Sequence, residues 1–316
     1  HCRILPRRIL MFRQGKGYAH GKVILIGEHA VVYNYEAIAI PIHTAKIEAT
    51  VSMSDITSIH SSLYKGLLEH SPKSLLPIKK LIEKLQENLA LPELHIQIDS
   101  SIQPHAGMGS SAAVAGAIVE AVYDYAELPL TKETRFDWVQ FSDTIAHTNP
   151  SGIDALITAS NDAIVFKKGS IPKYFPFELD AYLVIGYSGI EGETKLAVEH
   201  VANHYSDDKT RKLLDDIGNL SKNVILKLQT NQPASIGEDL NKAHNHLKAL
   251  GLSIDRLDEM VEVALNNQAY GAKMTGGGLG GCVLALTPTK AIADHIATLW
   301  QTTTQESVWV LDLHKG

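Results

Sequence analysis

The chain has 316 residues, 45% of them hydrophobic and 20% charged, which is the balance of an ordinary soluble globular protein rather than a disordered one. Because one hydrophobic core rarely grows beyond about 250–300 residues, this length favours two domains. The net charge of −6 excludes a general attraction to nucleic acid or to acidic membranes, so an anionic ligand requires a local positive site.

The N-terminal stretch and the cysteines indicate the compartment. Residues 1–10 are basic but lack the apolar stretch of a signal peptide, so we treat them as an extension or cloning remnant, with Met11 as a candidate natural start. No apolar run is long enough to span a bilayer. Cys2 and Cys282 do not suggest a disulfide framework, and a cytoplasmic location is expected.

An apolar run beginning at Gly21 and Lys22 predicts a strand that ends in the polar turn Gly27-Glu28-His29. A buried lysine here can neutralise charge on a transferring phosphoryl group, whereas a solvated lysine at a strand end is the more common fate. Glu28 and His29 can bind a polar substrate, although such a pair alone is not specific.

The next elements follow from the spacing of apolar residues. Alternation over residues 45–53 and again over 94–98 predicts two strands, each with one wet face. Helical spacing between them predicts a helix over residues 78–89. Antiparallel pairing is therefore expected in this half of the chain.

The stretch from Pro104 to Ala113 joins a strand to a helix of small residues at 114–125 through glycines and serines. Gly107 and Gly109 lack a Cβ, so the backbone can adopt positive φ and approach an anion closely. The helix start adds unbonded N–H groups, and Ser110 or Ser111 can cap it or reach a metal. The alternative interpretation is a common glycine turn with a serine cap.

A helix predicted near residues 136–147 ends at Asn149-Pro150 and is followed by Ser151-Gly152-Ile-Asp154. Asp154 can accept or orient the proton of an attacking hydroxyl, and Asp143 on the preceding helix can bind Mg²⁺. The structural alternatives are a capping box from Ser151 to Asp154 and a surface carboxylate at Asp143.

The remaining chain predicts a second domain of the α+β class. Strands are expected at 163–167 and 182–186 around a turn-rich segment at 169–176, with the domain boundary there: residues 11–175 form the first domain and residues 176–316 the second. Further expected elements are the following: helices near 192–204, 208–229, 234–250, 254–267 and 289–301, and strands at 282–286 and 307–312. The glycine density of Thr275 to Gly281 indicates close approach of the backbone to a ligand or to the other glycine loop.

The segments at Gly21–Tyr33, Pro104–Ala113, Asn149–Asp154 and Lys273–Gly281 together resemble the mevalonate kinase family. This family belongs to the superfamily of galactokinase, homoserine kinase, mevalonate kinase and phosphomevalonate kinase, abbreviated GHMP. The resemblance runs from about Lys16 to the C-terminus, with the motifs in the family's order.

The resemblance implies an α+β two-domain fold with its active site in the cleft between domains. It implies ATP-dependent, Mg²⁺-dependent phosphorylation of the C5 hydroxyl of mevalonate, a step of isoprenoid precursor synthesis. Monomer and homodimer both stay open, and no nucleic acid or membrane partner is expected.

Residue roles follow by position. Asp154 matches the catalytic aspartate, Lys22 the lysine beside it, and Ser111 with Asp143 the Mg²⁺ ligands. The nucleotide is expected at Pro104, Ala106, Gly107, Met108, Gly109, Ser110 and Ser111. Mevalonate is expected at Glu28, His29, Ser151, Gly152, Thr275, Gly276 and Gly277.

The chain departs from the family pattern at several positions. Asp143 stands where the family usually has glutamate, so its shorter side chain is expected to need a bridging water to reach Mg²⁺. His20 replaces a proline, and Asn34 and Glu36 replace a glycine and a proline. Asparagine tolerates left-handed backbone geometry, so the turn at Asn34 is expected to persist.

Three alternatives remain, of which a non-enzymatic nucleotide-sensing or scaffold protein on the same fold is disfavoured because Lys22, Ser111 and Asp154 are all present. Phosphomevalonate kinase or diphosphomevalonate decarboxylase would be sister activities. The spacing Gly107-x-Gly109-x-x-Ala112 also satisfies a dinucleotide-binding fingerprint, which would indicate an NAD-dependent dehydrogenase. That fingerprint needs an acidic residue at the end of a second strand, whereas Asp124 and Glu127 are expected at the end of the helix itself.

Overall fold

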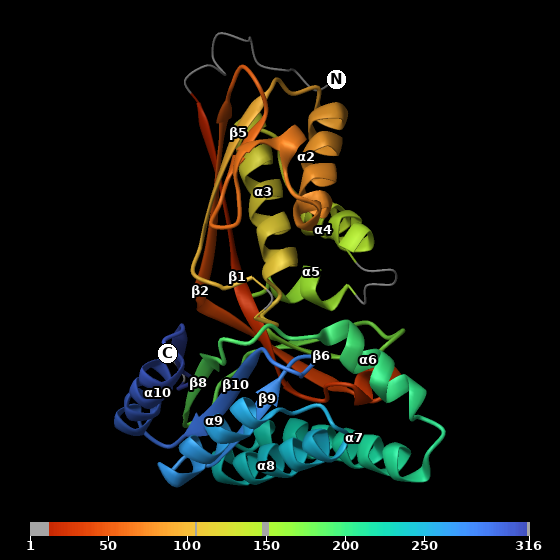
Figure 1. Ribbon diagram of the computed structural model, residues 1–316, viewed down its shortest axis with the longest axis vertical. Helices are drawn as coiled ribbons and strands as arrows, with labels where there is room; N and C mark the ends of the chain where they lie inside the picture. The colour runs from red at the N-terminus through yellow and green to blue at the C-terminus, as the bar shows by residue number, and fades with distance from the viewer. Residues whose placement is uncertain (1–12, 105, 147–151, 315–316) are drawn as a thin grey trace. The chain divides into compact units, whose positions relative to one another are not determined.

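The computed structural model describes residues 13–104, 106–146 and 152–314 (Figure 1). Its backbone contacts divide the chain into two compact units. Unit 1 comprises His1–Gly21, Ala45–Ile102 and Gly109–Ala159, and unit 2 comprises Lys22–Thr44, Gln103–Met108 and Ser160–Gly316. Each unit thus consists of three separate segments of the chain. The expected boundary at residue 175 instead divides the chain into two continuous domains, and it stays a prediction.

Helices and strands are mixed without regular βαβ alternation, so the expected α+β class is confirmed. The strands are β1 (Gln14–Ile26), β2 (Ala37–Met53), β3 (Ser58–His60), β4 (Lys65–Leu67), β5 (Leu94–Ser100), β6 (Ala163–Phe166), β7 (Lys173–Phe175), β8 (Tyr182–Tyr187), β9 (Gly271–Thr275), β10 (Cys282–Thr287) and β11 (Val308–Asp312). The α-helices are α2 (Leu76–Leu89), α3 (Ser110–Ala126), α4 (Lys132–Ala146), α5 (Ile153–Ile157), α6 (Thr194–Asn203), α7 (Asp208–Gln229), α8 (Pro233–Ala249), α9 (Asp255–Asn266) and α10 (Lys290–Thr304). Three short 3₁₀ helices are η1 (Ala30–Tyr33), η2 (Leu68–His70) and η3 (Lys73–Leu75).

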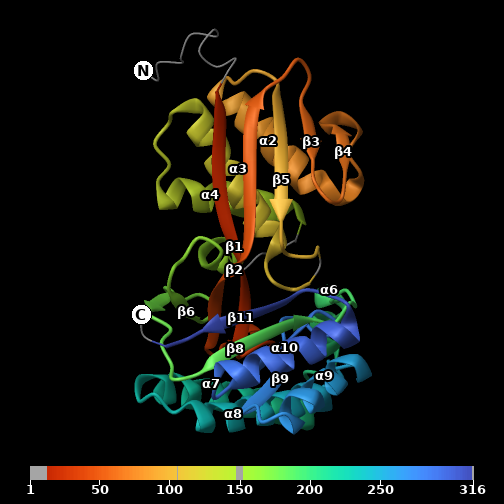
Figure 2. The ribbon, with the colours of Figure 1, turned by 90° about the vertical axis from the view of Figure 1, so that its left-hand side faces the viewer.

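Unit 1 is a sheet with helices on one face. Within it, β2 pairs antiparallel with β5 over Ile47–Met53, β3 joins β5 in parallel, and β4 pairs with β3. Figure 2 shows the strands in front of α2, α3 and α4. Ala45, Ile47, Ala49 and Val51 are buried while the residues between them are more exposed, which confirms the predicted alternation.

Helix α3 packs directly on β1 because the residues that face each other on the two elements are small. A Cβ added at Gly17 would lie 2.0 Å from the carbonyl oxygen of Ala117, and one at Gly15 would lie 2.1 Å from that of Ala121. These distances leave no room for a side chain. The small residues of this helix therefore allow its backbone to lie close to β1.

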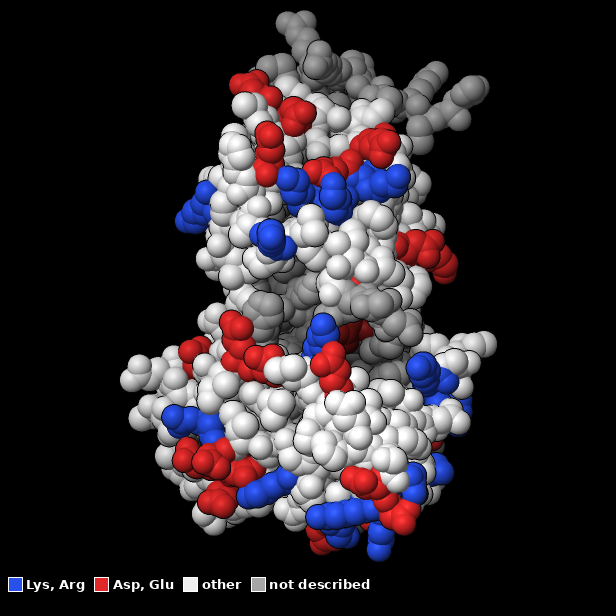
Figure 3. Space-filling model, turned by 45° about the vertical axis from the view of Figure 1, so that its right-hand side comes forward, with Lys and Arg blue, Asp and Glu red and all other residues white. Residues whose placement is uncertain are grey.

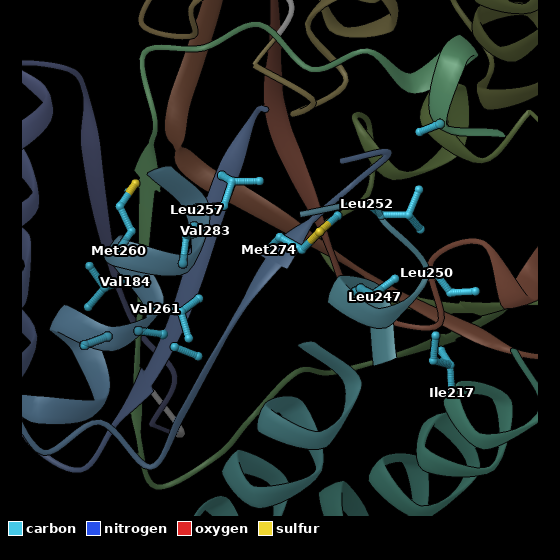
Figure 4. Close-up of a cluster of buried hydrophobic side chains, with 14 of the residues drawn as sticks. Val184, Ile217, Leu247, Leu250, Leu252, Leu257, Met260, Val261, Met274 and Val283 are labelled. Atoms are coloured by element: carbon cyan, nitrogen blue, oxygen red, sulfur yellow. The ribbon is translucent and has the colours of Figure 1, made fainter. Parts of the chain in front are cut away.

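Unit 2 is built on an antiparallel sheet in the order β11-β8-β10-β9. Figure 4 shows its core, in which side chains such as Val184 of β8, Met260 of α9 and Val283 of β10 pack together. Trp300 and Trp309 are buried, which agrees with their place in apolar sequence patterns. Trp138, which belongs to unit 1, is only partly buried and donates a hydrogen bond to Tyr123 Oη at 2.9 Å.

The differences from the sequence-based expectations concern short elements and boundaries. Strand β1 starts at Gln14, so Lys22 lies inside the strand rather than at its start. The segment at 169–176 contains β7 as well as a turn, β9 was not predicted, and neither were the three-residue strands β3 and β4. A strand of three residues carries too little periodicity to be recognised.

The molecular surface carries no dominant charge of one sign in the view of Figure 3. There, Lys and Arg side chains alternate with Asp and Glu side chains over each unit. Within the described ranges, none of the helices combines the length and the apolar character that crossing a membrane requires.

Candidate active site

Lys22 is tied to the first glycine loop within unit 2. It lies in β1 with 7% of its surface exposed. Its backbone N–H donates to the carbonyl oxygen of Met108 at 3.0 Å, and its Nζ donates to that of Gly107 at 3.4 Å. The alternative of a solvated strand-end lysine is therefore wrong, because β1 continues on both sides of Lys22 and buries it.

The turn after β1 presents a carboxylate and an imidazole in an unusual backbone conformation. Gly27 has φ 102°, and His29 has φ 60° with ψ −46°, which residues other than glycine rarely adopt. Glu28 and His29 are only 4% and 6% exposed. Strained geometry held inside a protein is typical of functional sites.

The imidazole of His29 is fixed by the second glycine segment. Its Nε2 lies 2.7 Å from the carbonyl oxygen of Gly277, and because a carbonyl only accepts, Nε2 carries the hydrogen. Burial lowers the pKa of His29 and favours the neutral ring. In this tautomer Nδ1 is an acceptor, suited to a hydroxyl donor.

Glu28 forms a buried ion pair with Lys273 of β9. Lys273 Nζ contacts Glu28 Oε1 and also donates to the carbonyl oxygen of Met274 at 2.6 Å. Desolvation raises the pKa of Glu28 and lowers the pKa of Lys273, since burial penalises both charges. Lys273 had no predicted role; the available signal was a lysine two residues before Thr275, where the glycine segment begins.

The second glycine segment lies against both β1 and the first glycine loop. Thr275 Oγ1 donates to the carbonyl oxygen of Ile24 at 2.8 Å and accepts from the Ile24 N–H at 3.0 Å. Gly276 has φ 88°, and a Cβ there would lie 3.6 Å from the carbonyl oxygen of Gly107. The expected approach of one glycine segment to the other is confirmed.

The first loop itself has the expected glycine geometry. Gly107 and Gly109 have φ 79° and 68°, and a Cβ on Gly107 would meet nothing within 4 Å. Ala106 and Met108 are buried, whereas Pro104 is partly exposed. The backbone of this loop therefore faces open space at Gly107, which is compatible with an anion.

Helix α3 begins at Ser110, and Gly109 is its N-cap without any side-chain cap hydrogen bond. The prediction that Ser110 or Ser111 caps the helix is therefore wrong, because left-handed Gly109 starts the helix one residue earlier. Ser111 is exposed in the first turn. The unbonded N–H groups of that turn form a site suited to phosphate.

The acidic residues of unit 1 lie on neighbouring helices. Asp154 is partly buried in the first turn of α5, which contacts α3 and α4. Gly152, with φ 78°, is the N-cap of α5, and the capping-box alternative from Ser151 to Asp154 stays untested. Ser151 lies outside the described residues. Asp143 on α4 is 5% exposed, so its interpretation as a surface carboxylate is wrong.

Two groups of the expected site residues thus emerge. Unit 2 brings together Lys22, Glu28, His29, the loop through Gly107 and Met108, and the segment Thr275–Gly277. Unit 1 carries Gly109, Ser110, Ser111, Asp143, Gly152 and Asp154. In the described part of the chain, no three or more His, Cys, Asp or Glu residues form a metal-binding group.

Sequence and structure comparisons identify related proteins. The family described as the GHMP kinases N terminal domain matches residues 77–161, and the GHMP kinases C terminal family matches residues 224–303. A mevalonate kinase of Pyrococcus abyssi is 33% identical over 314 residues, covering 90% of each chain. One from Pyrococcus horikoshii is also 33% identical, covering 85% of this chain and 88% of the relative.

Solved structures agree with this relationship. The mevalonate kinase of methicillin-resistant Staphylococcus aureus has a TM-score of 0.75 and 29% identity, over 96% of this chain and 100% of that chain. The mevalonate kinase of L. major, solved in complex with R-mevalonate, has a TM-score of 0.81 and covers 96% of this chain and 97% of its own. At 22% identity, the latter supports the fold alone.

Proposed function

Since the chain belongs to the mevalonate kinase family of the GHMP kinases, we propose that it transfers the γ-phosphoryl group of ATP to the C5 hydroxyl of mevalonate. The observation that carries this proposal is the convergence in unit 2 of Lys22, the Glu28-His29 turn and both glycine segments. Outside such a site, these buried polar groups would cost stability without benefit.

Phosphoryl transfer requires positioning and charge stabilisation more than covalent chemistry. Gly107 and the N-terminal turn of α3 provide N–H groups for the phosphates of ATP. Lys22 neutralises charge that develops on the transferring group. Asp154 orients the C5 hydroxyl and accepts its proton.

Ser111 and Asp143 would hold Mg²⁺. Their hydroxyl and carboxylate oxygens are the hard ligands that Mg²⁺ prefers, and a buried carboxylate such as Asp143 gains from a cation nearby. Mg²⁺ commonly completes its shell with water and substrate phosphates, so two protein ligands suffice. When bound, the ion neutralises charge on the phosphates.

Mevalonate has hydroxyl groups that need acceptors. Glu28 Oε2 is buried without a partner of normal hydrogen-bond geometry among the described residues, and Nδ1 of His29 is an acceptor in the tautomer set by Gly277. The backbone from Thr275 to Gly277 completes this group. These residues therefore form the proposed alcohol site.

A coupled assay of ADP release with mevalonate, phosphomevalonate, galactose and homoserine tests the proposal. We expect turnover with mevalonate, and a loss of at least about 100-fold in kcat for Asp154→Asn. Asp137→Asn, which changes an exposed aspartate of α4, is the matched control. Turnover only with another alcohol would refute the substrate, and full activity of Asp154→Asn would remove Asp154 from the mechanism.

The remaining alternatives predict other outcomes. Preference for phosphomevalonate in the same panel would favour the sister activity. The dehydrogenase hypothesis lacks its second strand, since Asp124 lies within α3, Glu127 follows that helix, and the next element is α4.

A further inference from the structure

Lys273 is a fully buried lysine whose presence the fold alone does not explain. Its exposure is 0%, and every residue of β9 is buried. Lysine is almost never fully buried unless paired, and replacing such a pair by apolar residues is often neutral or stabilising. A purely structural site in this sheet would be served as well by an apolar side chain, so a role in function is the better explanation.

The contacts of Lys273 are asymmetric. Its ammonium group binds Oε1 of Glu28 and the carbonyl oxygen of Met274, which fixes the carboxylate against β9. Oε2 of Glu28 is left buried with no partner of normal hydrogen-bond geometry among the residues that the structure describes, although the backbone N–H groups of Glu28 and Gly276 lie near enough to the carboxylate to lower its pKa against the effect of burial. Buried carboxylate oxygens are normally satisfied, so this one is suited to accept from a ligand hydroxyl.

The turn that carries Glu28 is held at two points. The side chain of Glu28 is bound by Lys273, and that of the next residue, His29, is bound by Gly277. Since His29 has an unfavourable backbone conformation, the turn depends on these contacts to keep its shape. Loss of the Lys273 side chain would remove the contact that holds Glu28 and leave only the contact between His29 and Gly277.

We infer that Lys273 is a positioning residue: it holds one oxygen of Glu28 so that the other can accept a hydrogen bond from a hydroxyl of the alcohol substrate. This inference rests on the proposed function. It assigns Lys273 to the alcohol site and not to ATP, since its partners are Glu28 and Met274.

The test compares Lys273→Met with a matched control, Lys227→Met. Lys227 also binds one carboxylate, Asp239 at 2.5 Å, and one backbone carbonyl, Ser235 at 3.2 Å, but between α7 and α8. We expect Lys273→Met to raise KM for mevalonate about 10-fold or more, with KM for ATP unchanged. Lys227→Met should leave both constants unchanged, and Lys273→Arg should restore part of the loss.

A double-mutant cycle separates positioning from a general structural effect. In a Glu28→Gln background, Lys273→Met should raise KM for mevalonate by no more than about 2-fold, because Lys273 acts through Glu28. An unchanged KM in Lys273→Met, or the same increase in both backgrounds, would overturn the inference. If Lys273→Met does not fold, Lys273→Arg decides: a change confined to the KM for mevalonate supports positioning, whereas no change, or an equal increase in the KM values for mevalonate and ATP, overturns it.

The outcome also distinguishes the two proposals. Wild-type protein that fails to phosphorylate mevalonate refutes the function and the inference with it. Wild-type activity together with an unaffected Lys273→Met variant refutes the inference alone.

Discussion

His244 makes the stability of unit 2 depend on pH. The N–H of Met274 donates to its Nδ1 at 3.4 Å, and its Nε2 lies 3.2 Å from Asp258 Oδ1. The ring therefore is neutral with hydrogen on Nε2, and a second proton would break the bond to β9. Burial lowers the pKa of His244 to about 4, against the opposing attraction of Asp258.

The different pKa values of His244 in the folded and unfolded states determine how the free energy of unfolding depends on pH. Between pH 6.5 and 4 the unfolded chain binds a proton at His244 that the folded chain does not, so unfolding becomes easier as the pH falls through this window. At pH 5 the binding term for this proton, one plus the ratio of the proton concentration to Ka, is roughly 30 in the unfolded state and near 1 in the folded state. Their ratio lowers the free energy of unfolding by about 2 kcal/mol, whereas at pH 7 the reduction is close to zero.

Urea unfolding at pH 7, 6 and 5, followed by tryptophan fluorescence, measures this contribution in the wild type and in His244→Gln. The variant lacks a hydrogen bond and should be less stable than the wild type at pH 7. Between pH 7 and pH 5, however, its free energy of unfolding should fall by about 2 kcal/mol less than that of the wild type. His246→Gln on the same helix is the control, because His246 is hydrogen-bonded to neither Asp258 nor Met274. Parallel pH profiles for the wild type and His244→Gln would refute the reasoning.

Three further predictions concern packing and reactivity. Gly17→Ala places a Cβ against the backbone of Ala117 and should lower the free energy of unfolding by about 1–3 kcal/mol; an unchanged thermal midpoint would contradict this contact. Trp300→Phe removes a buried indole hydrogen bond and some volume, so denaturant unfolding should show a loss of about 1–3 kcal/mol, and a change below about 0.5 kcal/mol would count against it. Burial raises the pKa of Cys282 to about 12, so in a Cys2→Ser background a thiol reagent at pH 8 should react only after unfolding; rapid reaction of the folded protein would disprove this.

Much of the fold could be predicted from the sequence because periodic patterns reflect burial. The alternation over residues 45–53 and the helical spacing over 208–229 both correspond to observed elements with buried faces. The left-handed geometry of Asn34, at φ 73°, confirms that asparagine preserves the turn where glycine was expected. Local signals of this kind depend on few residues and survive without tertiary information.

The burial of charged residues could not be predicted in the same way. Glu28 and Lys273 are 245 positions apart, so their pairing has no local signature. Asp143 reads as a surface residue in its helical pattern but is buried by the packing of α4 in unit 1. Helix α3 starts at Ser110, four residues before the predicted range of 114–125, and left-handed Gly109, not a serine side chain, forms its cap. The assigned roles of Asp154 and of the metal ligands stay predictions.

The pair formed by Glu28 and Lys273 has a consequence for engineering. Two isosteric apolar residues in its place would be expected to raise thermal tolerance, because neither charge would have to be stripped of water during folding. Laboratory evolution selected only for heat resistance would therefore favour loss of the pair, whereas selection for turnover would retain it. Heat-adapted variants should for this reason be screened for catalytic competence at every round.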